Sequence, residues 1–210
     1  MITRNLVRWS GLAAMAGPIL LAVADVMKYY VAPANDIDSL WMATSGWSIG
    51  AALITVGAFF MLGGLVGLYS RQVEKAGILG VVGFLTAFVG SALFIGLAWY
   101  FEFLVAPWLA VAAPELIDLE PSIRMAFGTV AIPGLLYILG WVLFGVASLR
   151  AKVFSGLAAT LLIIGMVLDP ITVALRIPVL AEAVLSVGMG WMGYNLWTEK
   201  GEILTQPAVQ

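Results

Sequence analysis

Ionisable side chains inside apolar segments are the residues of this 210-residue sequence best suited to binding a ligand. Three of them are the acids Asp25, Asp169 and Glu182, which lie at similar distances from one end of their apolar runs. At 1.5 Å per helical residue, each lies roughly 24 Å from the inner boundary of a bilayer core that is ~30 Å thick. The sequence therefore predicts three carboxyl groups at one depth, in the outer third of a membrane.

Charged neighbours accompany these acids. Lys28 follows Asp25 by one helical turn on the same face. Arg176 is expected near the outer boundary, and Glu102 closer still to the interface. A charge at the bilayer centre costs at least ~2.5–3.5 kcal/mol, so such residues usually face the bundle interior, form pairs or line a wet cavity. We predict an outward-facing polar pocket formed by Asp25, Lys28, Glu102, Asp169, Arg176 and Glu182.

A second interpretation of the same residues requires no pocket. Outer-third depth lets side chains reach the headgroups, with Asp25–Lys28 and Glu182–Arg176 as neutralising pairs. Carboxylate side chains are short and reach the headgroups poorly, so the pocket remains an alternative interpretation. If the acids share a pocket, the first helix must adjoin the fifth and sixth. Like charges held close cannot all ionise cheaply, so a proton or cation would exchange at such a site.

Composition assigns the chain to the membrane. It is 62% hydrophobic and 10% charged with a mean hydropathy of +1.05, whereas soluble domains are roughly 45–50% apolar and ~25% charged. The apolar runs are continuous, without the period-two alternation of outer-membrane strands. We predict an all-α integral membrane bundle of about six transmembrane helices in a single domain, 1–210. The helices are expected at about 9–30, 47–70, 76–104, 124–149, 153–175 and 178–198.

Basic residues predict the orientation. Seven of the ten Lys and Arg residues fall in four segments on one side, which are the N-terminus, the second and fourth loops and the C-terminus. Short loops rich in Lys and Arg stay in the cytoplasm, so both termini are predicted to be cytoplasmic. We expect Trp9 and Trp197 at the inner interface and Trp141 and Trp191 inside the bundle. The tryptophans expected near the outer interface are Trp41, Trp47, Trp99 and Trp108.

An internal similarity suggests a repeat. The sequence Ser-Gly-Leu-Ala-Ala occurs at 10–14 and again at 155–159, each time shortly after a basic residue and 14 or 15 residues before an aspartate. Three αα-hairpins of the same topology would explain it, although apolar sequences also match by chance. Glycines at four-residue spacing, such as Gly46/Gly50 and Gly63/Gly67, favour close helix contacts within the bundle over a dimer face.

Missing residue types exclude many activities. The sequence has no cysteine and no histidine, which removes thiol and imidazole catalysis and the usual zinc or haem ligands. It has no phosphate-binding loop or nucleophile motif, so no cofactor and no enzymatic activity are predicted. A net charge of −2 gives no reason to expect nucleic acid as a partner. The acids of segment 107–123, which are Glu115, Asp118 and Glu120, are interpreted as a solvated loop, with a short interfacial helix or a docking site as alternatives.

The segments 143–150, 155–159 and 161–165 resemble a recurring stretch of bacterial multi-pass, six-helix membrane proteins of unknown function. The residues that carry this resemblance are Leu-Phe-Gly-Val-Ala-Ser-Leu-Arg, Ser-Gly-Leu-Ala-Ala and Leu-Leu-Ile-Ile-Gly. It lies within 143–165, about a tenth of the chain, and implies a bacterial cytoplasmic membrane without implying an activity.

Two functional hypotheses follow. The first is a small binding or transport-type protein whose pocket accepts a cation, a proton or a small polar or amphiphilic solute. The second is a non-catalytic subunit or assembly factor of a larger membrane complex, with a membrane protein or a second copy as its partner in the lipid bilayer. An enzyme acting on lipid ranks third. The direction in which the acids point discriminates between the first two.

Overall fold

The computed structural model describes residues 4–31, 37–118 and 131–198, and in this part of the chain every regular element is a helix. Two short segments, η1 and η2, are π-helical and continue the α-helices before them. The elements are α1 (Arg4–Val26), η1 (Met27–Val31), α2 (Asp38–Met42), α3 (Ser45–Leu97), η2 (Ala98–Val105), α4 (Ala106–Ala112), α5 (Pro114–Ile117), α7 (Ala131–Ala151), α8 (Gly156–Ala174) and α9 (Val179–Thr198).

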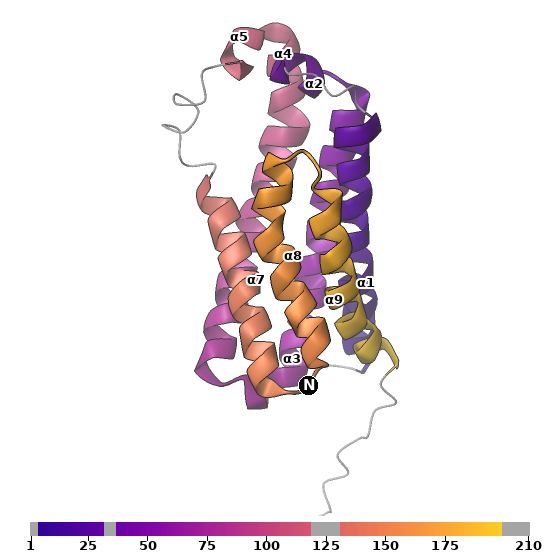
Figure 1. Ribbon diagram of the computed structural model, residues 1–210, viewed down its shortest axis with the longest axis vertical. Helices are drawn as coiled ribbons and strands as arrows, with labels where there is room; N and C mark the ends of the chain where they lie inside the picture. Colours follow the sequence, from indigo (N-terminus) through magenta and orange to yellow (C-terminus); the bar gives the residue numbers. More distant parts are fainter. Residues whose placement is uncertain (1–3, 32–36, 119–130, 199–210) are drawn as a thin grey trace, which may run out of the picture.

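The long helices stand side by side in one bundle, and α2, α4 and α5 lie over one end of it (Figure 1). We call this the capped end and the opposite one the N-terminal end, because α1 begins there. Helix α1 packs on α3 and α9, and α7 packs on α3 and α8. Since α8 also packs on α9, the helices form a closed ring of neighbours.

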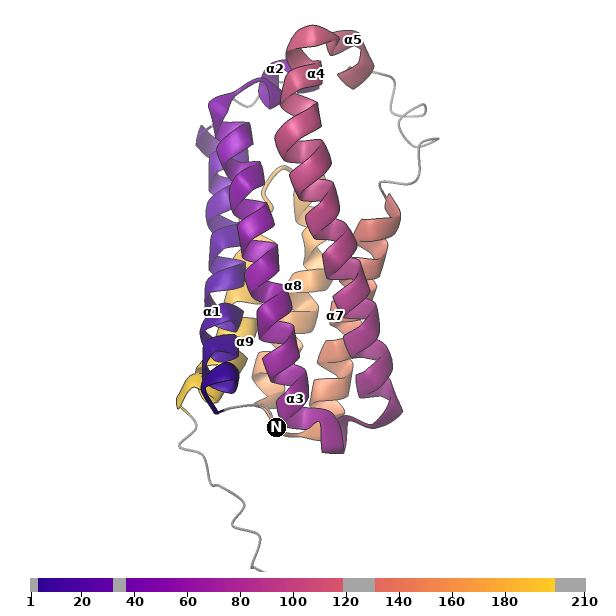
Figure 2. The same cartoon turned by 180° about the vertical axis from the view of Figure 1, so that it is seen from behind.

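Helix α3 reverses direction at Gly77, so that residues 45–76 and 78–97 form two arms (Figure 2). Gly77 has φ 58° and ψ −160°, a conformation that only glycine adopts readily. The rings of Tyr69 and Phe84 stack between the arms with centroids 4.2 Å apart. The first arm therefore extends to residue 76, beyond the predicted end at 70, because the turn needs one glycine and no loop.

Four stretches of the described chain are long and apolar enough to cross a membrane. They are Asn5–Val31, Ser45–Ala112, Ile132–Ala151 and Gly156–Ala174. Large apolar side chains cover the outside of the bundle; Ile78, for example, is 84% exposed. Such a surface is unusual for a protein in water and suits a lipid environment.

Some helix boundaries differ from the predicted ones. The start of the fourth predicted helix, 124–130, lies outside the described residues, and α7 is described from Ala131. Helix α8 begins at Gly156, with Ser155 at its N-cap position, so the predicted start at 153 was too early. The short helix α2 was not predicted, because five residues are too few to show a helical period.

Glycines let the helix backbones approach one another closely in the half of the bundle nearest the N-terminal end. A Cβ at Gly11 would lie 2.6 Å from the carbonyl oxygen of Gly193, and one at Gly64 would lie 2.7 Å from the Cα of Ala14. These contacts are within the chain, in keeping with the interpretation of the glycines as bundle contacts. Trp141 is fully buried as expected, whereas Trp191 is 42% exposed, which contradicts its predicted place inside the bundle.

Candidate functional site

A cavity of about 220 Å³ with several charged residues in its lining lies inside the bundle, in the half nearest the capped end. Its charged lining comes from α1 and η1, from η2, from α8 and from α9. Five of the six residues predicted for a pocket line this cavity: Asp25, Lys28, Glu102, Asp169 and Glu182. The rest of the lining is Leu21, Tyr29, Ile54, Phe94, Gly134, Tyr137, Ile138 and Val173.

Lys28 and Glu102 form an ion pair in the cavity wall, with 2.9 Å between Nζ and Oε2. The side chain of Lys28 is 6% exposed and that of Glu102 is 22% exposed. Both residues lie in π-helical segments, Lys28 in η1 and Glu102 in η2. Short π segments are rare and often mark functional sites.

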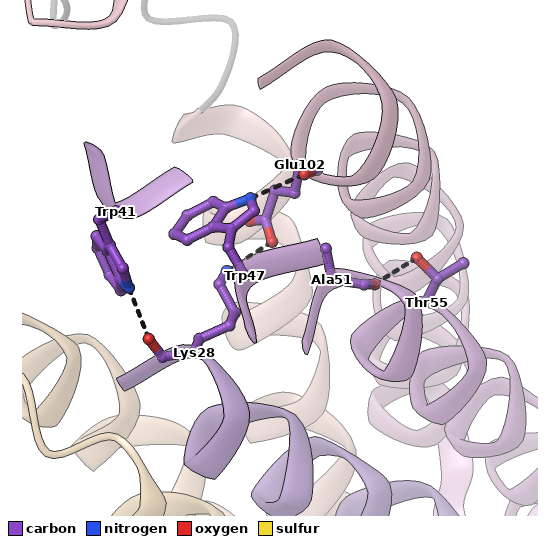
Figure 3. Close-up of polar contacts among 6 residues, drawn as sticks. All are labelled: Lys28, Trp41, Trp47, Ala51, Thr55 and Glu102. Atoms are coloured by element: carbon purple, nitrogen blue, oxygen red, sulfur yellow. Dashed lines mark hydrogen bonds and ion pairs between the residues drawn. The ribbon is translucent and has the colours of Figure 1, made fainter. Parts of the chain in front are cut away.

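Two tryptophans enclose this ion pair (Figure 3). The indole Nε1 of Trp41 donates a hydrogen bond to the backbone oxygen of Lys28 at 2.6 Å. In the same way, Nε1 of Trp47 donates to the backbone oxygen of Glu102 at 2.9 Å. The ammonium of Lys28 also lies 3.8 Å from the ring centroid of Trp47, a favourable cation–π contact. Trp41 and Trp47 are therefore buried parts of the site, in addition to lying at the capped end.

The ion pair formed by Lys28 differs from the predicted one with Asp25. That prediction assumed a regular α-helix, in which residues three apart share a face. The α-helix ends at Val26, and η1 begins at Met27. A π-helix bonds i to i+5, which places more residues in each turn and changes the direction of the side chains that follow.

The other three acids face the cavity from three different helices. Asp25 is on α1, Asp169 on α8 and Glu182 on α9. In the described part of the chain, the one ion pair of the cavity wall is that of Lys28 with Glu102. Glu182 is 9% exposed, and its Oε2 atom is buried without a hydrogen-bond partner. Buried carboxyl oxygens normally have a hydrogen-bond partner, so the unpartnered oxygen of Glu182 indicates that the cavity holds a further group.

The helix neighbours agree only in part with the predicted arrangement. Helix α9 packs against both α1 and α8 and so lies between them. Asp25 and Asp169 nevertheless line one cavity, because both lie near the capped end of their helices. They do not point to opposite outer faces of the bundle.

Arg176 is the predicted site residue that does not line the cavity. It follows α8 in a left-handed conformation with φ 59°. The amide of Arg176 donates to the carbonyl of Val173, and that of Ile177 donates to the carbonyl of Thr172. This pattern ends many helices and usually uses glycine where Arg176 stands. The guanidinium lies 5.8 Å from the ring centroid of Trp41, so Arg176 lies beside the tryptophan that contacts Lys28.

The acidic segment at the capped end is partly helical and not simply a solvated loop. Asp118 follows α5 and accepts hydrogen bonds from the amide of Ser39, at 2.9 Å, and from its hydroxyl, at 2.6 Å. Ser39 is in the first turn of α2, where a carboxylate is favourable. Glu115 lies in α5, and Glu120 lies outside the described residues.

The aromatic lining was missed by the sequence analysis. Phe94 and Tyr137 stack with ring centroids 4.7 Å apart, and the Tyr137 hydroxyl donates to the sulfur of Met61 at 3.3 Å. A tyrosine inside an apolar run is a signal for a polar partner. Its position relative to the acids depends on which helices are neighbours, and the apolar pattern does not show this.

The described residues contain no group of three or more acids close enough to hold a metal ion. The cavity therefore has the charge to attract a cation but lacks the ligand cluster that a bare metal ion requires.

Comparison of the chain with protein-family models, with curated proteins and with solved structures finds no match.

Proposed function

We propose that this protein is a six-span membrane protein with both termini in the cytoplasm and its cavity on the outer side. The reversal at Gly77 supports two spans within the stretch Ser45–Ala112, and α9 is long enough for a sixth span. The distribution of Lys and Arg supports the orientation. At the N-terminal end, the guanidinium of Arg8 lies 4.5 Å from the ring centroid of Trp197, a pairing typical of a membrane interface.

We further propose that the cavity binds and exchanges a cation or a proton, as in a small binding or transport-type protein. One observation carries this proposal: Asp25, Asp169 and Glu182 face one cavity, while the lysine in its wall is paired with Glu102. Several carboxyl groups gathered away from water are costly, and a bound cation or protons would offset that cost. In membrane proteins such groups mark ion pathways and proton relays.

The alternative is a non-catalytic subunit or assembly factor of a larger complex. That role predicts acids directed at a partner protein or at the headgroups. The enclosure of the three acids around one cavity favours binding instead. A three-hairpin repeat would fit either role and stays a prediction.

Proton flux in liposomes tests the proposed function. Purified protein is reconstituted with a pH-sensitive dye inside, and gradients of sodium, potassium or tetramethylammonium chloride are imposed. At least one cation should drive proton flux above the rate of protein-free liposomes, and Asp169→Asn should remove it. Glu74→Gln is the matched control, since Glu74 is exposed on the first arm of α3, away from the cavity. If no cation drives flux through correctly folded protein and none binds to it, the subunit role becomes the better explanation.

A further inference from the structure

The structure already holds one ammonium group, that of Lys28, and shows which groups surround it. Its Nζ lies 2.9 Å from the Glu102 carboxylate and 3.8 Å from the ring centroid of Trp47. A carboxylate together with an aromatic face is the usual environment for recognising organic ammonium ions. The stem of Lys28 lies against Gly50, where a Cβ would collide with it.

Deeper in the cavity, the same two kinds of group recur without a lysine. Asp25 and Asp169 provide carboxylates, and Phe94 and Tyr137 provide aromatic rings in the same lining. The buried Oε2 of Glu182 has no hydrogen-bond partner there. These groups would suit a second ammonium, brought by a ligand instead of by the chain.

The remaining lining argues against a metal ion and for an organic cation. Leu21, Ile54 and Ile138 give the cavity apolar walls, which a hydrated metal ion does not need. No metal-binding group of acids occurs among the described residues. Ligand pockets for small organic molecules combine apolar walls with a few polar groups in this way.

We infer that the ligand of this cavity is an organic ammonium ion, with its charged head at Asp25 and Asp169 and its apolar part against Phe94, Ile138 and Leu21. This inference rests on the proposed function and names its substrate class. Lys28 then stays in the cavity wall, held at Glu102 beside Trp41 and Trp47. The ammonium comes either from a free amine or from an amine-bearing lipid headgroup.

Calorimetric titration of the whole protein in neutral maltoside micelles tests the inference with defined probes. Butylammonium should bind at least about tenfold more tightly than butanol, which has the same apolar part without the charge. Sodium and magnesium chloride should show no saturable binding. Competition by dihexanoyl phosphatidylethanolamine but not by dihexanoyl phosphatidylglycerol would identify a headgroup as the source. Absence of that competition would identify a free amine.

Two variants locate the binding. Asp25→Asn should weaken butylammonium binding about tenfold or more, because it removes a carboxylate from the head site. Gly134 lines the cavity with open space beside its Cα, so Gly134→Leu should fill the cavity and also weaken binding. Gly96→Leu is the control, since Gly96 also borders open space but is exposed outside the cavity.

Equal binding of butanol and butylammonium would overturn the inference, as would binding of sodium or magnesium alone. In those cases cation-driven proton flux would still support the proposed function. Loss of binding in Gly96→Leu as well as in Gly134→Leu would place the ligand outside the cavity and would also overturn the inference. If neither flux nor binding of any cation occurs, both proposals fail.

Discussion

The two halves of the bundle are held together in different ways. Toward the N-terminal end, glycines bring helix backbones into contact, as at Gly11 against Gly193. Toward the capped end, the helices surround a cavity, and the Lys28–Glu102 pair and indole hydrogen bonds connect them. In lipid, close packing replaces the hydrophobic effect as the force between helices. The capped half keeps some close contacts, as at Gly50 against Ala24, and adds a charge pair to them.

The largest expected effect comes from breaking the ion pair of the capped half. Glu102→Gln leaves the ammonium of Lys28 buried without its counter-ion and should lower the free energy of unfolding by about 3 kcal/mol. Lys28→Met should cost less, because Glu102 is the more exposed partner. The double variant should be more stable than Glu102→Gln alone, because no charge is then stranded. Unfolding in sodium dodecyl sulfate followed by circular dichroism measures all three, and three equal, small effects would show that the pair does not stabilise this half.

A glycine substitution probes the close-packed half. A Cβ at Gly188 would lie 2.8 Å from the backbone oxygen of Ala158, whereas one at Gly190 meets no atom within 4 Å. Both glycines are in α9, so valine carries the same helix propensity at either position. Gly188→Val should therefore lower the free energy of unfolding by about 1–3 kcal/mol relative to Gly190→Val. Equal stability of the two variants in the same assay would mean that α8 and α9 do not depend on close approach.

The smallest effect compares the turns at the two ends of α8. Lys152 and Arg176 both have left-handed backbones, with φ 53° and φ 59°. Lys152→Gly should relieve this strain and raise the free energy of unfolding by about 0.5–1 kcal/mol. Arg176→Gly should give a smaller gain, because it also removes the contact with Trp41, worth about 0.5 kcal/mol. Thermal unfolding in detergent compares the two variants. Equal gains would show that the contact between Arg176 and Trp41 does not stabilise the protein.

The sequence indicated most of the charged residues of the cavity, but several of their partners depend on the path of the backbone. Asp25, Asp169 and Glu182 stood out because a charge inside an apolar run is costly, and all three line the cavity. Lys28 forms its ion pair with Glu102 instead of Asp25, and the sequence gives no signal for the π segments η1 and η2 that hold these two residues. The contact between Ser39 and Asp118 joins residues 79 positions apart and depends on how α2 and α5 meet at the capped end. Trp191 was misplaced because apolar sequence alone does not show which face of α9 is exposed.

The separation of Lys28 from Glu102 has a consequence for how the chain is made. The two residues are 74 positions apart, so during synthesis α1 enters the bilayer well before Glu102 leaves the ribosome. In that interval Asp25, three residues before Lys28, is the counter-ion available on the same helix. The ammonium would then pass from Asp25 to Glu102 once η2 is in place, and this exchange would leave Asp25 facing the cavity. A nascent chain that stops before residue 102 should consequently depend on Asp25 for insertion of its first helix, whereas the finished protein should not.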